Sequence, residues 1–387
     1  MEQQNRNGTM WRAVIRWLLA AAAAVAAIAL AFPVFGALLH TAPAVSLPAA
    51  PAQDGNVMAQ FDTHIRDTLG NSLADMEPIR WIWELSDEDL IAPEPNPACF
   101  GTTEDPASLG WLLEEARETL GVETVVFSTD TEIMEGSEVR YYLDDSIFVV
   151  TWKQIVNRCV YSMSEVKVAH PSQFRRYVAD GTYGSESLYY PSVMATKVNA
   201  VTASNGDFYM QRSWGVNIYM GQVQNVSTKV DTCYIDGNGD MIFTRAGEIR
   251  TEEEAQAFAD AHDVRFSLAF GPVMVENGVN VVPSSYPLGE INDRYARAAL
   301  CQLGQLHYLL VAANQQGGYK GLVTSSGFAD ELVKLGVEKA FAVDGGQSAA
   351  IVTGDKLINR PVYGVQRAMS DIIYFATAIP EDRWNEE

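Results

Sequence analysis

The segment 343–348 (VDGGQS) combines one carboxylate with two glycines and two polar side chains. The apolar run 339–343 before it predicts a buried strand, so Asp344 is expected at the end of that strand. Glycine permits unusual backbone angles and close approach of a ligand, and successive N–H groups at such a corner can bind an anion. An ordinary tight turn with a solvated carboxylate explains the same residues, and both interpretations stay open.

A second carboxylate, Asp207, lies in a similar context. The segment 205–209 (NGDFY) follows the run 198–204 (VNAVTAS), which predicts another strand ending in a small polar corner. An Asn-Gly pair is also the usual sign of a hairpin turn. Cleavage of a glycosidic bond commonly uses two carboxyl groups, one that protonates the leaving oxygen and one that acts on the anomeric carbon or on water. The pairing of two strand-end acids in one chain therefore favours glycosidase chemistry.

Two arginines have the positions expected of phosphate ligands. Arg297 lies in the small, apolar run 295–299 (YARAA), where an arginine is seldom buried without a partner. Arg367 comes just before the predicted final strand 371–376. The guanidinium group matches phosphate oxygens with two parallel hydrogen bonds. A structural salt bridge to one of the chain's many acids is the alternative for Arg297, and also for Arg360.

Several other chemistries lack the residues that they need. Residues 346–350 (GQSAA) resemble a nucleophile elbow, but the last glycine is missing and no histidine follows Ser348. A calcium-loop start at 236–240 (DGNGD) is followed by Met241 where glycine is needed, so a turn is predicted there. The histidines and cysteines lack zinc-site spacing, and free thiols or disulfides both remain open for the four cysteines. We therefore predict neither a metal site nor a cofactor.

Strand and helix patterns surround these corners. Short β-branched runs predict strands at 147–152, 198–204, 242–244 and 371–376. Apolar residues at helical spacing predict helices at 109–120, after the capping residue Thr251, and across 328–335. Strands grouped with interspersed helices predict an α+β fold with a mixed β-sheet core and flanking helices.

An uncharged run rich in alanine and leucine fills residues 17–39, after Arg6, Arg12 and Arg16. A helix of this length would cross a hydrocarbon core of about 30 Å. The preceding arginines place the N-terminus in the cytoplasm. We therefore predict a single-pass transmembrane helix in the lipid bilayer of the cell membrane, with the C-terminal domain outside. Secretion after cleavage of a signal peptide is the alternative, which the length of the run disfavours.

Composition divides the chain of 387 residues into five parts. They are a cytoplasmic tail (1–16), a transmembrane anchor (17–39), a Pro/Ala linker (40–55), a smaller helical accessory region (56–138) and a strand-rich domain (139–380). The net charge of −22 repels polyanions, which excludes nucleic acid as a partner. Any phosphate must therefore be bound by a local cluster of arginines and N–H groups.

In their order along the chain, these motifs resemble the phosphodiester glycosidase family, whose bacterial members are often labelled exopolysaccharide-related. The resemblance spans about residues 140–380. It includes 165–173 (EVKVAHPSQ), the 205–209 corner, 270–278 (FGPVMVENG), the segment around Arg297, the 343–348 corner and 359–367. The chain departs from the family at Gln347, where a third glycine is frequent, and at Ala298 and Cys301, where threonine and glycine are frequent.

The resemblance implies hydrolysis of a sugar-1-phosphodiester, with a glycan or sugar phosphate as substrate. It implies that Asp207 and Asp344 share the acid, base or nucleophile roles, and that Arg297 acts with them on the phosphate. The implied substrate-binding residues are Asn205, Gly206, Gly271, Gly345, Gly346, Gln347, Ser348, Asn359 and Arg367. The alternative is a non-catalytic carbohydrate-binding or envelope-assembly protein on the same fold.

Overall fold

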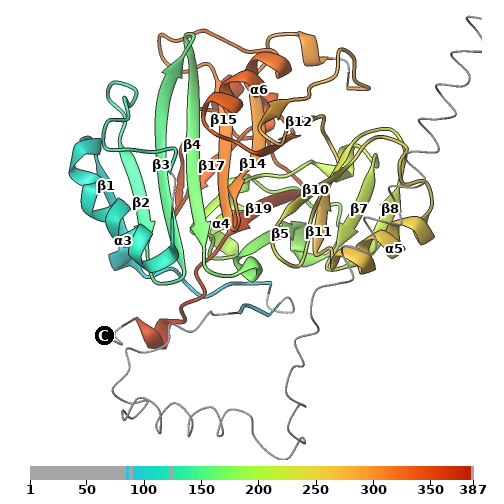
Figure 1. The fold of residues 1–387 in the computed structure, drawn as a ribbon, viewed down its shortest axis with the longest axis horizontal. Coiled ribbons are helices and arrows are strands. Elements are labelled where there is room, and N and C mark those ends of the chain that lie inside the picture. The colour runs from blue at the N-terminus through green and yellow to red at the C-terminus, as the bar shows by residue number, and fades with distance from the viewer. Residues whose placement is uncertain (1–83, 87–89, 123–124, 289, 385–387) are drawn as a thin grey trace, which may run out of the picture. The chain divides into compact units, whose positions relative to one another are not determined.

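The computed structural model of the chain describes residues 84–86, 90–122, 125–288 and 290–384 (Figure 1). Within these ranges, no helix combines the length and the apolar character that crossing a membrane requires. The predicted cytoplasmic tail, the anchor at 17–39 and the linker at 40–55 lie outside the described residues.

The described strands form three antiparallel sheets. The large sheet has nine strands in the spatial order β1 (Phe100–Thr103), β2 (Val139–Leu143), β3 (Ile147–Val156), β4 (Cys159–Val168), β15 (His307–Asn314), β14 (Arg297–Gly304), β16 (Lys339–Val343), β12 (Val273–Glu276) and β13 (Val279–Asn280). One five-stranded sheet has the order β10 (Met241–Thr244), β9 (Thr232–Ile235), β11 (Phe266–Leu268), β7 (Val216–Tyr219) and β8 (Gln222–Val226). The other has the order β18 (Lys356–Leu357), β17 (Ile351–Thr353), β6 (Thr202–Asn205), β19 (Asp371–Phe375) and β5 (Phe174–Val178).

The α-helices of the described residues are α3 (Gly110–Leu120), α4 (Pro191–Lys197), α5 (Glu252–His262) and α6 (Ser325–Lys334). α3 ends where Gly121 adopts a φ of 64°, a left-handed conformation that glycine takes at no steric cost. The side chains of Thr251 and Thr324 cap α5 and α6 by accepting main-chain N–H groups of their first turns. The predicted helices at 109–120, after Thr251 and near 328–335 are thus confirmed.

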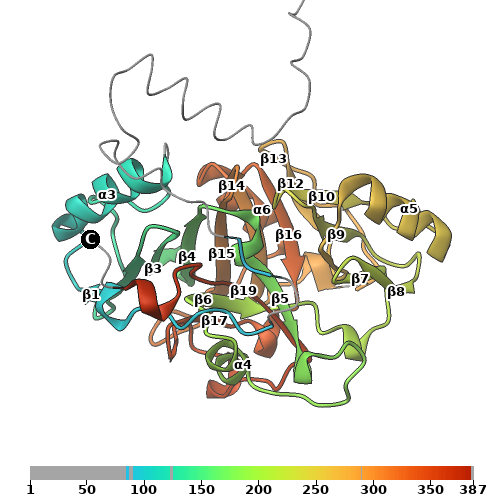
Figure 2. The same cartoon turned by 90° about the horizontal axis from the view of Figure 1, so that it is seen from below.

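The large sheet is buried on both of its faces. Along β3, Phe148, Val150 and Trp152 pack with residues of α3 and α6 on one face. Ile147 and Val149 point to the opposite face and pack with residues of β9, β17 and β19 from the two smaller sheets. Figure 2 shows β6, β17 and β19 on the lower side of β3 and β4 in that view. A run as apolar as 147–152 is therefore explained by burial on two faces.

The predicted α+β class with a mixed sheet and a helical accessory region is wrong, because the described chain is mostly β and its strand pairs are antiparallel. β16, expected in a mixed sheet, runs antiparallel to both of its neighbours, β14 and β12. Within the range 56–138, β1 pairs with β2 at the edge of the large sheet. Tight connections cause this arrangement: Asn157 and Arg158, with φ values of 50° and 65°, join β3 directly to β4, and such hairpins only connect antiparallel strands.

Two smaller sequence questions are answered by the structure. The carboxylate of Asp236 accepts the N–H groups of Asn238 and Asp240 at 2.9 and 2.8 Å, which confirms the predicted turn between β9 and β10. All four cysteines are free thiols, and Cys99 alone among them is partly exposed.

Candidate active site

The two strand-end corners meet in the structure. The N–H of Asp344, directly after β16, donates to the carbonyl oxygen of Gly206, directly after β6, at 3.3 Å. The side chain of Asn205 donates from Nδ2 to the carbonyl oxygen of Asp344 at 2.8 Å and accepts the N–H of Ala350 at 3.0 Å. Hydrogen bonds of the main chain and of one buried amide therefore hold the two corners together.

A cavity of about 200 Å³ lies beside the Asp344 corner. Residues that the sequence analysis selected make up part of its lining: Gly271, Arg297, Asp344, Gly345, Gly346, Gln347 and Arg367. Other lining residues, which sequence reasoning did not select, include Arg212, Phe270, Glu290 and Tyr295. Three guanidinium groups and the carboxyl group of Asp344 therefore surround one hollow.

Asp344 has the surroundings of a proton-exchanging group. Its side chain is 13% exposed, and Oδ2 lies 3.9 Å from Nη1 of Arg367. Burial raises the pKa of the Asp344 carboxyl, although a hydrogen bond with Ser348 and the charges of Arg367 and Arg212 oppose the rise. Burial therefore outweighs the two nearby cations, and the carboxyl group titrates closer to neutral pH than an exposed aspartate does.

Arg367 and Arg212 reach the cavity from different segments. Arg367 donates to Oγ of Ser348 at 3.4 Å, and its guanidinium carbon lies 4.6 Å from the centre of the Phe208 ring. Its side chain is 42% exposed, so the guanidinium fork remains open to a ligand. The guanidinium carbon of Arg212 lies 5.4 Å from the centre of the Phe270 ring. Aromatic faces thus orient both cations without neutralising them.

Arg297 is committed mainly to the protein itself. Its Nη2 donates to the carbonyl oxygens of Glu290 at 2.7 Å and Asp293 at 2.8 Å, and its Nε donates to that of Val323 at 3.4 Å. Burial lowers the pKa of this guanidinium group. Within the described residues Nη1 has no hydrogen-bond partner, so Arg297 orders the loop at the cavity wall and keeps one nitrogen for a ligand.

The two glycines after Asp344 allow close packing rather than a complete anion nest. A Cβ atom on Gly345 would lie 2.6 Å from the carbonyl oxygen of Ala296, so only glycine fits there. Gly346 has a φ of 61° and donates its N–H to the same oxygen at 2.9 Å. The N–H of Ser348 donates to Gly345 at 3.1 Å. The N–H groups of Gly346 and Ser348 are therefore used within the protein.

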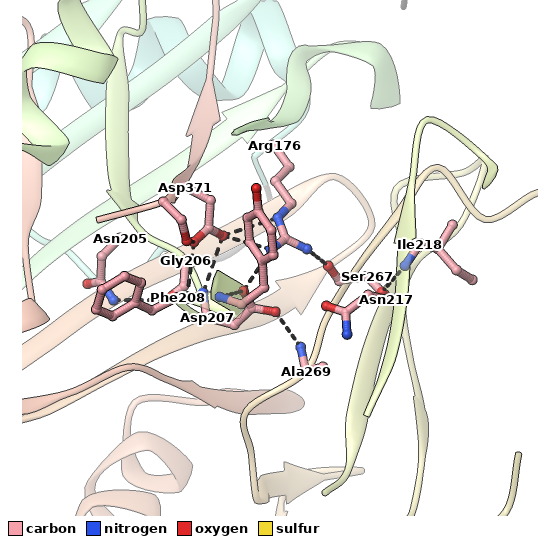
Figure 3. Close-up of polar contacts among 12 residues, drawn as sticks. Arg176, Asn205, Gly206, Asp207, Phe208, Asn217, Ile218, Ser267, Ala269 and Asp371 are labelled. Atoms are coloured by element: carbon pink, nitrogen blue, oxygen red, sulfur yellow. Dashed lines mark hydrogen bonds and ion pairs between the residues drawn. The ribbon is translucent and has the colours of Figure 1, made fainter. Parts of the chain in front are cut away.

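The carboxyl group of Asp207 is buried and is not among the residues that line the cavity. Figure 3 shows this carboxyl group among its partners, which include Arg176 and Ala269. The side chain of Asp207 has no exposed area, and Oδ1 lies 2.7 Å from Nη2 of Arg176. Oδ1 also accepts the N–H of Tyr209 at 3.1 Å, and Oδ2 accepts that of Ala269 at 2.7 Å. Both oxygens are thus engaged by donors of the protein.

Asp371 completes a buried charge cluster with Arg176 and Asp207. Arg176 lies 2.9 Å from Asp371, whose carboxylate also accepts the N–H groups of Asp207 at 3.3 Å and Phe208 at 3.1 Å. Burial and the charge of Asp371 raise the pKa of Asp207 to about 7, although Arg176 opposes the rise. A Cβ atom on Gly206 would lie 1.8 Å from Oδ2 of Asp371, so the corner needs glycine at this position.

This charge cluster supports two walls of the cavity from behind. Ala269, which donates to Asp207, directly precedes the lining residues Phe270 and Gly271. The N–H of Phe208 donates to Asp371, and the guanidinium group of Arg367 lies over the Phe208 ring. The positions of both cavity segments therefore depend on the same buried ion pairs.

The remaining predicted site residues are not part of the cavity lining. Asn205 joins the corners, and Ser348 contacts Arg367. Asn359 is buried, accepts the N–H of Ile351 at 2.8 Å and donates to the carbonyl oxygen of Ala349 at 2.8 Å. These side chains hold the chain that follows Asp344.

Sequence reasoning missed three residues of this region. An arginine in the apolar strand β5 (FRRYV) is the same signal that selected Arg297, so Arg176 could have been found. Asp371 begins the apolar strand β19, and a charged residue in an apolar run is again the signal that could have found it. Arg212 lies in a polar segment and carries no such signal.

A larger hollow, of about 560 Å³, lies elsewhere on the protein and includes Phe100, Arg140 and Asp355 in its lining. Its lining contains one arginine, whereas three arginines and the largely buried carboxyl group of Asp344, whose pKa is raised, line the smaller cavity. Charge and protonation chemistry therefore favour the smaller cavity as the site. Within the described residues, no group of three or more histidine, cysteine, aspartate or glutamate side chains is placed to hold a metal ion.

Residues 198–376 match a family model described as phosphodiester glycosidase, which confirms the predicted resemblance. The matched range contains both corners, the three arginines of the cavity, Asp207 and Asp371. No curated protein matches the chain significantly by sequence. A domain of this family supports hydrolysis of a phosphodiester-linked sugar and implies a glycan substrate.

Three solved structures show low similarity to this chain. The zebrafish N-acetylglucosamine-1-phosphodiester alpha-N-acetylglucosaminidase catalytic domain, auto-inhibited by its pro-peptide, has a TM-score of 0.49 and 16% identity, covering 67% of this chain and 93% of that one. A hypothetical protein from Synechocystis has a TM-score of 0.43 and 14% identity, covering 64% of each chain. A putative exported protein from Burkholderia pseudomallei has a TM-score of 0.42 and 12% identity, covering 57% and 74%. The family match, and not these similarities, assigns the domain.

Proposed function

We propose, from the phosphodiester glycosidase domain at 198–376, that this chain hydrolyses the bond between a sugar's anomeric carbon and a phosphodiester in the cavity beside Asp344. The observation that carries this proposal is the pairing of a largely buried carboxyl group of raised pKa with a guanidinium group 3.9 Å away. Two further arginines line the same cavity. Asp344 can exchange a proton in this cavity, while the arginines bind phosphate.

The arginines are placed to stabilise the negative charge that develops on the leaving phosphate. When water attacks the anomeric carbon, the bond from that carbon to oxygen breaks and its electron pair stays with the phosphate. The phosphate leaves as a monoester that carries one more negative charge than the diester did. Arg367 and Arg212 are placed to bind the phosphate oxygens as this charge develops, while Arg297 orders the cavity wall.

Asp344 acts in this proposal as the base that takes the proton from the attacking water. A phosphate monoester has a second pKa of about 6, so it leaves without a proton from the enzyme near neutral pH. The proton that needs an acceptor is therefore that of water. A general base is most effective when its pKa lies near the working pH, and burial moves the pKa of Asp344 in that direction.

Asp207 has a positioning role in this proposal, in place of the catalytic role that the family resemblance implied. Its oxygens accept hydrogen bonds from Arg176, Tyr209 and Ala269, and its side chain has no exposed area. A carboxylate in these surroundings has no path to substrate, but it holds the chain that leads into Phe270.

We place the reaction at the outer cell surface, on an envelope or exopolysaccharide-related glycan. The support is the uncharged run 17–39 that follows three arginines, together with the glycan substrate that the family implies. Protease added to intact cells should degrade the domain from 84 onward. A domain that is cut only after cell lysis would contradict this location.

Labelled water tests the reaction directly. The purified full chain is incubated with α-N-acetylglucosamine-1-phosphodiesters and other glycosyl-1-phosphodiesters in water enriched in ¹⁸O. Cleavage at the anomeric carbon places the label on the released sugar, whereas cleavage at phosphorus places it on the phosphate. Label on the phosphate would contradict the proposed bond, and binding without release of sugar would favour a non-catalytic carbohydrate-binding protein.

A further inference from the structure

Exposed apolar side chains gather beside the candidate active site. Of the eleven large apolar side chains that are exposed in the described part of the chain, six belong to two short segments, 188–193 and 363–365. They are Leu188, Tyr189, Tyr190, Val193, Tyr363 and Val365, and we refer to them as the aromatic platform. Such a concentration of exposed apolar side chains is typical of a binding surface.

Hydrogen bonds hold the two platform segments side by side. The Gln366 side chain accepts the N–H of Ser192 at 3.1 Å and donates to Oγ of the same serine at 2.8 Å. The N–H of Met369 donates to the carbonyl oxygen of Tyr189 at 2.8 Å, and that of Tyr189 donates back at 3.0 Å. The two platform segments are therefore neighbours in the structure, although they are far apart in the sequence.

The platform continues into the cavity at its phosphate-binding side. Gln347, which lines the cavity, donates from Nε2 to the carbonyl oxygen of Val365 at 3.4 Å. Arg367, which also lines the cavity, follows Val365 by two residues. Because Arg367 is the proposed phosphate ligand, the platform lies on the side of the group that leaves with the phosphate.

Tyr363 presents its ring to solvent from an ordered loop. It is 85% exposed and has a φ of 69°, a conformation that is unusual for an aromatic residue. The N–H of Gly364 donates to the carbonyl oxygen of Pro361 at 2.9 Å, which closes the turn around it. Uncommon backbone conformations of this kind gather at ligand-binding sites, where the surrounding structure maintains them.

The two platform segments contain no charged side chain, although the Tyr189 hydroxyl donates to Asp180 at 2.8 Å. The segments 188–193 (LYYPSV) and 361–366 (PVYGVQ) contain no charged residue, whereas the chain carries a net charge of −22. A polyanionic ligand is therefore disfavoured. Tyrosine offers a flat apolar ring and a hydroxyl group, which together match the C–H face and the hydroxyl groups of a neutral sugar.

We propose that the aromatic platform binds neutral sugar units of the group that leaves with the phosphate, so that the substrate is a glycan chain joined through phosphate to the hydrolysed sugar. This proposal rests on the proposed function, because the direction along the substrate is taken from the phosphate-binding role of Arg367. The small cavity then binds the cleaved bond, and the platform supplies affinity for long substrates.

Two substrates of different length test the proposal. The first is the N-acetylglucosamine-1-phosphodiester of methanol, and the second is the same diester of a mannotetraose. For the wild-type full chain we expect a KM for the tetraose diester about tenfold below that for the methyl diester. Sugar rings that stack on one or two tyrosines should improve binding by about this factor. The variant Y190A/Y363A should lose this difference while its kinetics on the methyl diester stay unchanged.

Matched variants separate ring stacking from other effects. Y190F/Y363F keeps both rings and should keep most of the difference, and Trp111→Ala removes an exposed ring outside the platform and should change neither KM. Equal KM values of wild type and Y190A/Y363A for the tetraose diester would overturn the proposal. If neither diester is cleaved, the proposed function fails, and calorimetric titration of the tetraose diester into both proteins still decides whether the platform binds it.

The same variants test a lipid as the occupant. Binding to vesicles of phosphatidylcholine and phosphatidylglycerol should be equal for wild type and Y190A/Y363A. A loss of vesicle binding in the variant, with glycan affinity unchanged, would assign the platform to a membrane surface and overturn the glycan proposal.

Discussion

Asp344 and Asp207 follow the same sequence pattern and have opposite surroundings. Each comes after a strand of the core and sits in a corner with glycine, and a main-chain hydrogen bond of 3.3 Å joins the two corners. The side chain of Asp344 turns toward a cavity and has one guanidinium group at 3.9 Å. That of Asp207 turns into the protein, where Arg176 and two main-chain N–H groups engage it.

The difference is the reason why we assign the proposed reaction to Asp344 and a positioning role to Asp207. Asp207 is fully buried and does not line the cavity, so its oxygens do not face a substrate there, whatever the pKa of the group is. The pKa of Asp207 rises to about 7, which pKa alone would count in favour of catalysis. Access to the cavity decides in favour of Asp344. The predictions below test this contrast in order of expected effect.

Removing the charge of Asp344 should have the largest effect on activity. We expect Asp344→Asn to lower kcat by about a thousandfold, because loss of a general base typically costs two to four orders of magnitude. Release of sugar from a glycosyl-1-phosphodiester measures it, and circular dichroism verifies the fold. Unchanged kcat in a folded variant would remove Asp344 from the mechanism.

Removing Asp207 should act on stability first. Asp207→Ala leaves Arg176 paired with Asp371 but removes the acceptor of the buried N–H groups of Tyr209 and Ala269, and each unsatisfied donor costs about 1–3 kcal/mol of the free energy of unfolding. Urea unfolding measures the loss, and the exposed Asp355→Ala is the matched control, for which we expect no change. An Asp207→Ala protein of full stability that lacks activity would instead support the catalytic role implied by the family resemblance.

Arg367 should affect substrate binding more than the chemical step. Replacing it with lysine keeps the charge but removes the guanidinium fork, so we expect KM to rise about tenfold, as for the loss of one hydrogen bond to a charged group. Steady-state kinetics with the methyl diester as substrate measure this change in KM. A change confined to kcat would contradict a role in phosphate binding before the bond breaks.

The pH dependence should differ in sign between activity and stability at Asp344. As a base, the group works when ionised, so kcat/KM should rise with pH through its raised pKa and become constant above it. A carboxyl group with a raised folded-state pKa contributes stability that is present below the unfolded pKa and is lost as pH rises through the folded pKa. Asp344→Asn should therefore have a higher Tm than wild type above that pKa and an equal Tm below about pH 3.8.

The opposite pH dependence of activity or of stability would change the role or the energetics that we assign to Asp344. If kcat/KM falls as pH rises through the same range, Asp344 acts as an acid and not as a base. If Asp344→Asn has the lower Tm at neutral pH, attraction by Arg367 and Arg212 outweighs the burial of the carboxylate.

Local pattern was enough to predict many elements and the family. The helices α3, α5 and α6 and the strand β16 follow from apolar spacing, capping residues and glycine stops, all of which act within about one or two turns of chain. The ordered motifs around Asp207, Arg297 and Asp344 were enough to identify the phosphodiester glycosidase domain. Pairing direction was not predicted correctly, because it depends on neighbours such as β14 and β12 that lie far from β16 in the sequence.

The sequence by itself determined which residues stand at strand ends, and it selected Asp207, Asp344, Arg297 and Arg367 as candidate site residues. Only the tertiary structure decided that Asp344 opens into a cavity while Asp207 is enclosed by Arg176, Asp371 and Ala269. The physical reason is that the direction of a side chain after a strand depends on which donors the packed core brings to it. The donors Arg176 and Ala269 come from β5 and from the chain after β11, and the neighbouring carboxylate of Asp371 comes from β19; only folding brings these segments together.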